Sequence, residues 1–407
     1  MIDTGCKPAN WRSLISAVVA TASLWTVLMI GAQPALAAVD KITSSTQIAL
    51  KTPSPAIPES ALLDVGIPRL NDGLELTDED DTVFPEIRFA EGIYFSNQLA
   101  KILEKSGAWG AVRVIPNRDI IVDLYITGTI LQADGETLAL DIQVVDSSGA
   151  KWFAKKYQQR VGKYAYDRRL KSLADPFQNL FVRIANDLLN YREKLSNQKA
   201  EQLRQLSELR FAKLFSPQAF DDYVGKKRNG ILTIERLPAS DDRILQRVQK
   251  IRDRDYLYID SMQDYYDEFS QRMHFPYQDF RRSSYDSVVK ARQLKKQGNS
   301  RIIAGVGAVL AGIYGRSQAT STVANDASIS TAAVGGYIIK SGLEKKQQAA
   351  AYNEAVAEMG VSLEAEIAPR VIALEDQTIT LTGTVQAQYQ QWLELLQKIY
   401  QQERGDL

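Results

Sequence analysis

The strongest constraint on the fold is the run TLALDIQVVD at residues 137–146, in which apolar and polar side chains alternate. Successive side chains of a strand point to opposite faces, so this pattern predicts a strand with one buried face. Such a strand needs a sheet and a covering layer. Four more strands are predicted at 62–70, 111–116, 123–132 and 151–161, and one helix at 94–107 that ends at Gly107. Residues 62–163 are therefore predicted to form a mixed α/β sandwich domain.

The stretch VDLYITGTILQADGETLALDIQVVDSSGAKWFAKKY, residues 122–157, resembles the small α/β domain of the TolB N-terminal and CsgG-like envelope proteins. Those families share a strand with the pattern TG-x-I, a hairpin, and a V-D-x-x-G turn before the last strand. The matching residues here are Thr127, Gly128, Ile130, Val145, Asp146 and Gly149. The resemblance implies an envelope module for assembly or interaction.

The first 37 residues have the pattern of a secretory signal peptide. Lys7 and Arg12 precede an uncharged apolar run, and Ala35-Leu36-Ala37 supplies small residues at the expected cleavage site after Ala37. A retained anchor is the alternative, because about 17 apolar residues nearly span a bilayer. Residues 38–61 are rich in Pro, Ser and Thr and are predicted to be an extended linker. We expect a periplasmic protein, with outer-membrane association as a further option.

Cleavage would leave a chain without cysteine, because Cys6 lies in the signal peptide. Disulfides, thiol chemistry and thiolate metal sites are then excluded, and stability must come from buried apolar area. Removing Asp3, Lys7 and Arg12 leaves 47 basic and 48 acidic residues, a net charge of −1. This balance argues against nucleic acid as a partner.

Residues 175–298 are predicted to form a helical domain. Asp175 and Pro176 have the pattern of a helix N-terminus, and a long helix is predicted to begin near Ser240. Its apolar stripe favours a long packed helical hairpin or a short coiled coil. The stripe consists of Leu245, Val248, Ile251, Tyr258, Ile259, Met262, Tyr266, Phe269 and Met273.

The same helix is dense in tyrosine, which leaves two interpretations open. The first is a packed core with tyrosine hydroxyls at its rim. The second is a glycan-binding or glycan-hydrolysing surface, to which Tyr265, lying off the stripe, would contribute. In the second case acids such as Asp264 or Glu268 would sit in a cleft with carboxylates about 5 to 10 Å apart.

Residues 300–343 contain two glycine-rich apolar segments joined by a polar stretch. Each glycine costs a helix up to about 1 kcal/mol relative to alanine, so several of them need a compensating contact. Rows of small residues one helical turn apart let two helix backbones approach closely. We therefore predict a glycine-zipper helical hairpin. Its predicted contact residues are Ala304, Gly307, Ala308, Ala311, Gly312, Gly315, Ala332, Gly335 and Gly336.

Each arm of this predicted hairpin has about 13 apolar residues, or roughly 20 Å of helix, against about 30 Å for a hydrocarbon core. Three outcomes remain: oligomeric insertion in a thinned membrane, packing between subunits, or burial inside the chain's own domain. The flanks KARQLKKQGNSR and KSGLEKK are basic and favour contact with anionic headgroups.

Residues 344–407 are predicted to form a polar helix, a β-hairpin and a C-terminal helix. Ile379, Leu381 and Val385 alternate with threonines, and Trp392 begins an apolar helical face in QAQYQQWLELLQKIY. The sequence TITLTGTV followed by a helix resembles half of a BON domain, an envelope module associated with membrane surfaces. A hairpin docked on the helical region is the simpler interpretation.

The chain as a whole is predicted to be α+β and non-catalytic. His274 is the only histidine and is predicted to be a helix-end residue, so histidine-based triads and multi-histidine metal sites are excluded. No phosphate-binding loop is present, and we expect no cofactor or metal. The expected partners are a membrane surface or an envelope protein, together with further copies of the chain. The favoured hypothesis is an envelope scaffold; a glycan-binding protein or cell-wall carboxylate hydrolase is the alternative.

Overall fold

The computed structural model describes residues 47–76, 83, 85–166, 175–239, 241–296, 358, 370–373 and 378–405. The fold is α+β, with a five-stranded mixed sheet, as the sequence predicts. The sheet has the order β2-β1-β3-β4-β5. Its strands are β1 (Val65–Pro68), β2 (Val112–Ile115), β3 (Leu124–Ala133), β4 (Thr137–Asp146) and β5 (Lys151–Arg160).

The sheet combines two kinds of pairing. β1 pairs in parallel with both β2 and β3, whereas β3, β4 and β5 form an antiparallel meander. Tight turns join the antiparallel strands: Asp134 Oδ1 accepts from the amides of Glu136 and Thr137, both at 2.7 Å. In the next turn Asp146 accepts from the amide of Ser148, and Gly149 has φ +85°. All five predicted strands are confirmed.

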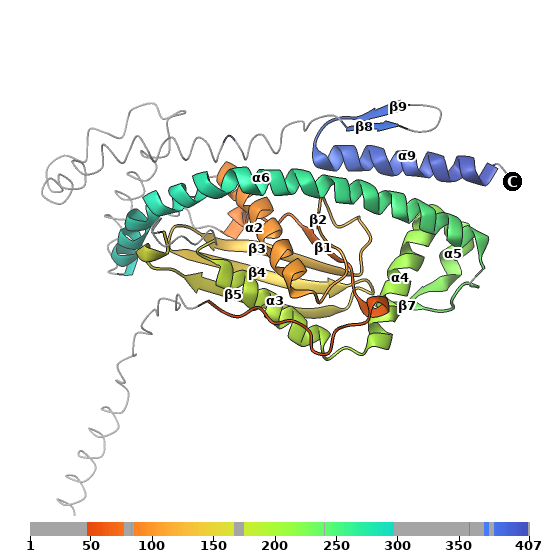
Figure 1. Ribbon diagram of the computed structural model, residues 1–407, viewed down its shortest axis with the longest axis horizontal. Helices are drawn as coiled ribbons and strands as arrows, with labels where there is room; N and C mark the ends of the chain where they lie inside the picture. Colours follow the sequence, from red (N-terminus) through yellow and green to blue (C-terminus); the bar gives the residue numbers. More distant parts are fainter. Residues whose placement is uncertain are drawn as a thin grey trace, which may run out of the picture. The chain divides into compact units, whose positions relative to one another are not determined.

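One face of the sheet is buried under two helices, α2 (Pro85–Ser106) and α3 (Gln178–Arg192), which also pack against each other (Figure 1). The alternation in β4 behaves as predicted, because the four predicted inward residues are fully buried: Leu138, Leu140, Ile142 and Val144. Helix α2 ends before Gly107, whose φ of +63° provides the left-handed conformation that closes many helices. Burying each of the four inward side chains of β4 contributes on the order of 1.5–3 kcal/mol to the stability of the fold.

The helices after residue 175 share this core, so the predicted boundary between 62–163 and 175–298 is not a break in packing. α3 lies on the sheet, and α4 (Asn197–Phe215) contacts the turn η1 (Glu59–Ala61) that precedes β1. Short elements follow α4: α5 (Pro217–Phe220), η4 (Asp221–Tyr223) and the hairpin β6 (Val224–Lys226) with β7 (Leu232–Ile234). This hairpin was not predicted from the sequence.

Helix α6 (Arg243–Lys296) is continuous over 54 residues and runs along α2 and past β2 (Figure 1). It begins at Arg243, directly after the predicted start at residues 240–242, and Asp242 Oδ1 accepts from the amides of Ile244 and Leu245 in its first turn. The predicted apolar stripe is buried, with Leu245 partly so. The prediction that His274 lies at a helix end is wrong, because α6 continues through Pro276 to Lys296. Tertiary contacts on both sides of the proline outweigh the lost backbone hydrogen bond.

The predicted C-terminal hairpin and final helix are confirmed, whereas the predicted polar helix before them lies outside the described residues except for residue 358. β8 (Arg370–Ala373) and β9 (Thr378–Leu381) pair antiparallel, and α9 (Val385–Gly405) packs on α6 with its apolar face. Trp392, Leu395 and Leu396 are buried there. Two short helical turns complete the described elements, η2 (Leu74–Leu76) and η3 (Lys163–Tyr166). Within the described ranges, no helix combines the length and apolarity needed to cross a bilayer.

Candidate functional site

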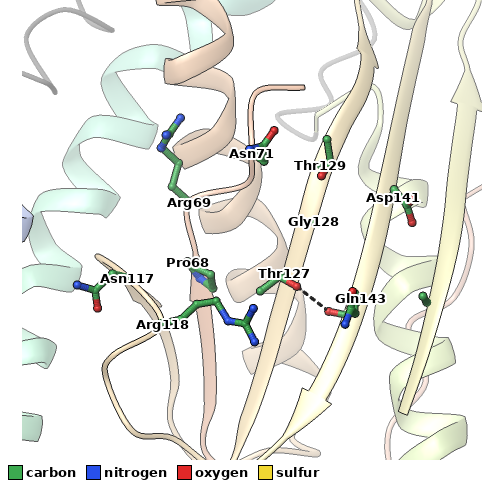
Figure 2. Close-up of a pocket in the computed structure, with 11 residues that line it drawn as sticks. Pro68, Arg69, Asn71, Asn117, Arg118, Thr127, Gly128, Thr129, Asp141 and Gln143 are labelled. Carbon is green, nitrogen blue, oxygen red and sulfur yellow. Dashed lines mark hydrogen bonds between the residues drawn. The ribbon is translucent and has the colours of Figure 1, made fainter. Parts of the chain in front are cut away.

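A hollow of about 600 Å³ opens on the face of the sheet opposite α2 and α3 (Figure 2). We call it the sheet hollow. Its lining comes from the end of β1 and the segment after it, from the loop after β2, and mainly from the outward positions of β3, β4 and β5. The lining residues are Pro68, Arg69, Asn71, Asn117, Arg118, Thr127, Gly128, Thr129, Asp141, Gln143 and Ala154.

The first wall is the segment that continues β1. The amide of Asn71 donates to the carbonyl of Gly128 at 2.8 Å, and the carbonyl of Asn71 accepts from the amide of Ile130 at 2.9 Å. This pairing extends the strand-like alternation beyond β1. Leu70 is therefore buried in the core, whereas Arg69 and Asn71 lie at the hollow.

The second wall is the loop from β2 to β3. The hydroxyl of Tyr125 donates to the carbonyl of Ile120 at 3.0 Å and accepts from the amide of Val122 at 3.2 Å, which fixes the loop over the sheet. Side chains at both ends of this loop pack closely against the backbone of Gly66. A Cβ at that position would lie 2.7 Å from Ile115 Cδ1 and 2.9 Å from Val122 Cγ2. The loop presents Arg118, which extends toward Thr127 on β3 (Figure 2).

The floor follows from strand register. Thr127 pairs with Gln143 and Thr129 pairs with Asp141, so these four side chains share the outward face of β3 and β4. The Thr127 hydroxyl donates to the carbonyl of Gln143 at 3.4 Å. Hydroxyl, amide and carboxylate groups thus form a polar floor. The lining contains one carboxylate, from Asp141, and two guanidinium groups.

The long helix α6 is joined to other elements by polar contacts along most of its length. In order, they join Gln249 to Glu208, Arg252 to Ser207, Asp260 to Arg113, Asp267 to Asn97, His274 to Tyr94, Tyr277 to Glu91, Asp286 to Lys163, and Arg292 to Glu136. These partners lie on α4, β2, α2, η3 and the β3–β4 turn. The helix is therefore an integral part of the α/β unit.

Gln263 of α6 covers the edge of the sheet. Its amide accepts from the backbone N–H of Val114 at 2.8 Å and donates to the carbonyl of the same residue at 3.0 Å. An unpaired strand edge otherwise invites pairing with another chain. The side chain supplies both hydrogen bonds that a neighbouring strand would make at this position.

A buried acid–base cluster joins α6 to α2 and to the start of α3. Asp175 accepts from Arg281 at 2.5 Å, from Gln278 at 2.9 Å, from Tyr94 at 3.0 Å, and from the amide of Phe177 at 2.8 Å. Burial raises the pKa of Asp175, but the charge of Arg281 and the hydrogen bonds outweigh it, so the pKa lies below its ordinary value. The carboxylate is ionised and fully paired.

A second buried acid, Asp255, lies between α6 and α9. It accepts from Trp392 Nε1 at 3.2 Å and from the hydroxyl of Tyr389 at 3.4 Å, and it is 2 % exposed. Burial raises the pKa of Asp255 to about 7, against the opposing hydrogen bonds and the charge of Arg252. This acid therefore titrates near neutral pH.

The C-terminal end of α6 is held by a third buried acid. Glu136, in the β3–β4 turn, accepts from Arg160 of β5 at 2.7 Å and from Arg292 of α6 at 2.7 and 2.9 Å. Nearby, Lys163 contacts Asp286 at 2.8 Å. The last described turns of α6 are thus bound to the sheet by charge-assisted hydrogen bonds.

The residues predicted to form the functional contact lie outside the described residues. These are Ala304, Gly307, Ala308, Ala311, Gly312, Gly315, Ala332, Gly335 and Gly336. The acids of the alternative hypothesis are described: Asp264 is exposed on α6, and Glu268, also exposed, pairs with Arg272 at 3.4 Å. Tyr258, Tyr266 and Tyr277 are buried in the core.

The sheet hollow was not predicted from the sequence. Its floor was visible only as the polar half of the alternation in β3 and β4, and such residues usually face water. The other sequence signal for the hollow was a pair of polar residues after each of two apolar strands. These pairs are Arg69 with Asn71 and Asn117 with Arg118. Comparison with protein-family models, with curated proteins and with solved structures finds no match for the chain.

Proposed function

We propose that the protein is a non-catalytic scaffold of the bacterial cell envelope that acts after export to the periplasm. In this proposal the α/β unit provides the folded body. Residues 300–343 contact a membrane or another copy of the chain through their small side chains. The TolB N-terminal and CsgG-like resemblance of residues 122–157 agrees with this role but remains a prediction.

One observation carries the proposal: α6 is bound to the α/β unit over its length, and residue 300 follows its end by four positions. The buried Glu136 pairs close to that end with Arg292, whose side chain is partly exposed. This pair and the Lys163–Asp286 pair hold the end of α6 on the α/β unit. In the proposal, a contact made by residues 300–343 is transmitted to the sheet through this end of α6.

The hydrolase alternative is not favoured by the positions of its acids. Asp264 and Glu268 lie exposed on α6, and the sheet hollow is lined by no residue of that helix. A glycosidase of the usual kind needs two carboxylates flanking one bond, at about 5 to 10 Å from each other. The lining of the hollow supplies one, Asp141.

The test enlarges the small residues. Replacing Gly307, Ala311, Gly312 and Gly315 by leucine removes the surface on which a second backbone can approach closely. We expect the protein to move from the membrane pellet to the soluble fraction, or its native mass to fall to that of one chain. Fractionation and native mass spectrometry measure the two outcomes.

The matched control enlarges neighbouring apolar residues that are not among the predicted contact residues, with Val306→Leu, Val309→Leu and Ile313→Leu. This variant should keep the wild-type distribution and mass. A four-leucine variant that fractionates and assembles as the wild-type protein does would refute the proposed contact.

A further inference from the structure

We propose that the sheet hollow is a binding site for a carbohydrate that carries a carboxylate group. The hollow has the size of small-ligand sites, which span about 300 to 1,000 Å³. Its lining is more polar than most such sites, with two hydroxyls, three amides, two guanidinium groups and one carboxylate. A ligand of similar polarity, with many hydroxyl groups, matches this lining.

The charge of the hollow favours an anion, and Arg118 is the group available to bind it. Arg69 is engaged, because its guanidinium lies over the Phe89 ring at 4.2 Å and 3.7 Å from Asp72. Arg118 is exposed, extends over the floor, and has no ion pair or hydrogen bond among the residues that the structure describes (Figure 2). A guanidinium binds a carboxylate through two parallel hydrogen bonds.

The floor can bind hydroxyl groups. Thr129 and the Gln143 amide each offer donor and acceptor atoms, and Asp141 between them offers two acceptor oxygens. Pro68 and Ala154 add small apolar surfaces at the two sides. The hollow has room for a sugar ring whose hydroxyls would reach these groups.

The position on the sheet disfavours a peptide. A peptide that binds a sheet usually adds to an edge strand and uses main-chain hydrogen bonds. The hollow lies on the face of β3 and β4, whose backbones are paired with each other and with their outer neighbours. Recognition here depends on side chains alone, which suits a carbohydrate.

The test is calorimetric titration of the full chain with sodium D-glucuronate, with D-glucose as the uncharged probe and tetraglutamate as the peptide probe. We expect glucuronate to bind at least about tenfold more tightly than glucose, because one hydrogen bond to a charged group contributes about that factor to affinity. Arg118→Ala should weaken glucuronate binding by about tenfold or more. Arg228→Ala, which removes an exposed arginine in the β6–β7 turn, should leave the binding unchanged.

Thr129→Val tests the carbohydrate part of the proposal, since it removes one floor hydroxyl at nearly constant volume and should weaken glucuronate binding. The proposal is overturned if glucuronate does not bind, if tetraglutamate binds as tightly, or if Thr129→Val changes nothing while Arg118→Ala does. The last result would indicate general anion attraction. The leucine variants of residues 307–315 test the scaffold proposal separately, because they leave the hollow intact.

Discussion

Replacing Arg281 by methionine is expected to lower the free energy of unfolding by about 3 to 5 kcal/mol, the cost of leaving a buried charge without its partner. The Arg281 guanidinium lies 2.5 Å from Asp175, and the two side chains are 1 % and 2 % exposed. Methionine preserves most of the volume between the rings of Phe177 and Tyr277, which the guanidinium contacts at 5.1 and 4.1 Å. Urea unfolding followed by circular dichroism measures the change.

Two further variants separate lost charge pairing from lost packing. Arg272→Met removes the exposed partner of Glu268 on the same helix and should change the unfolding free energy by less than about 1 kcal/mol. Adding Asp175→Asn to Arg281→Met should recover part of the loss, because no unpaired charge then remains. If Arg281→Met costs no more than Arg272→Met, the buried pair does not hold α6 in place.

The second large effect is a pH dependence centred on Asp255. The folded protein holds this proton more tightly than the unfolded chain, because the pKa of Asp255 is about 7 in the fold and 3.8 ordinarily. This group therefore stabilises the fold most below about pH 4, and its contribution is lost as pH rises toward 7. Between pH 5 and pH 8 the loss is about 3 kcal/mol.

Asp255→Asn removes this titration and keeps an acceptor for Trp392. From pH 5 to pH 8 the unfolding free energy of the wild type should fall by about 3 kcal/mol relative to that of the variant. Asp264→Asn neutralises an exposed acid on the same helix, and its unfolding free energy should follow that of the wild type from pH 5 to pH 8. Equal pH profiles for wild type and Asp255→Asn would mean that the acid is not buried against α9.

Local periodicity predicted most of the secondary structure. The alternation in β4 and the helical stripe of α6 are patterns within one segment, and burial confirms both. The continuity of α6 was not predictable in the same way. Pro276 and the neighbouring His274 resemble a helix end, and only tertiary partners such as Tyr94 and Glu91 show why the helix continues.

The contacts that organise the molecule join residues far apart in the sequence. Asp175 and Arg281 are separated by 106 positions, and Glu136 and Arg292 by 156. Neither residue of a pair carries a local signal that identifies its partner. The sheet hollow has the same origin, because its walls follow two strands that are adjacent in the sheet and separated by α2 in the chain.

Amide hydrogen exchange along α6 tests most directly whether this helix belongs to the α/β unit and can couple the following segment to the sheet. If it does, the amides of residues 277–292 should exchange as slowly as those of β4, since both would open only when the whole unit unfolds. Exchange of residues 277–292 at the rate of an unfolded peptide, with β4 still protected, would contradict it.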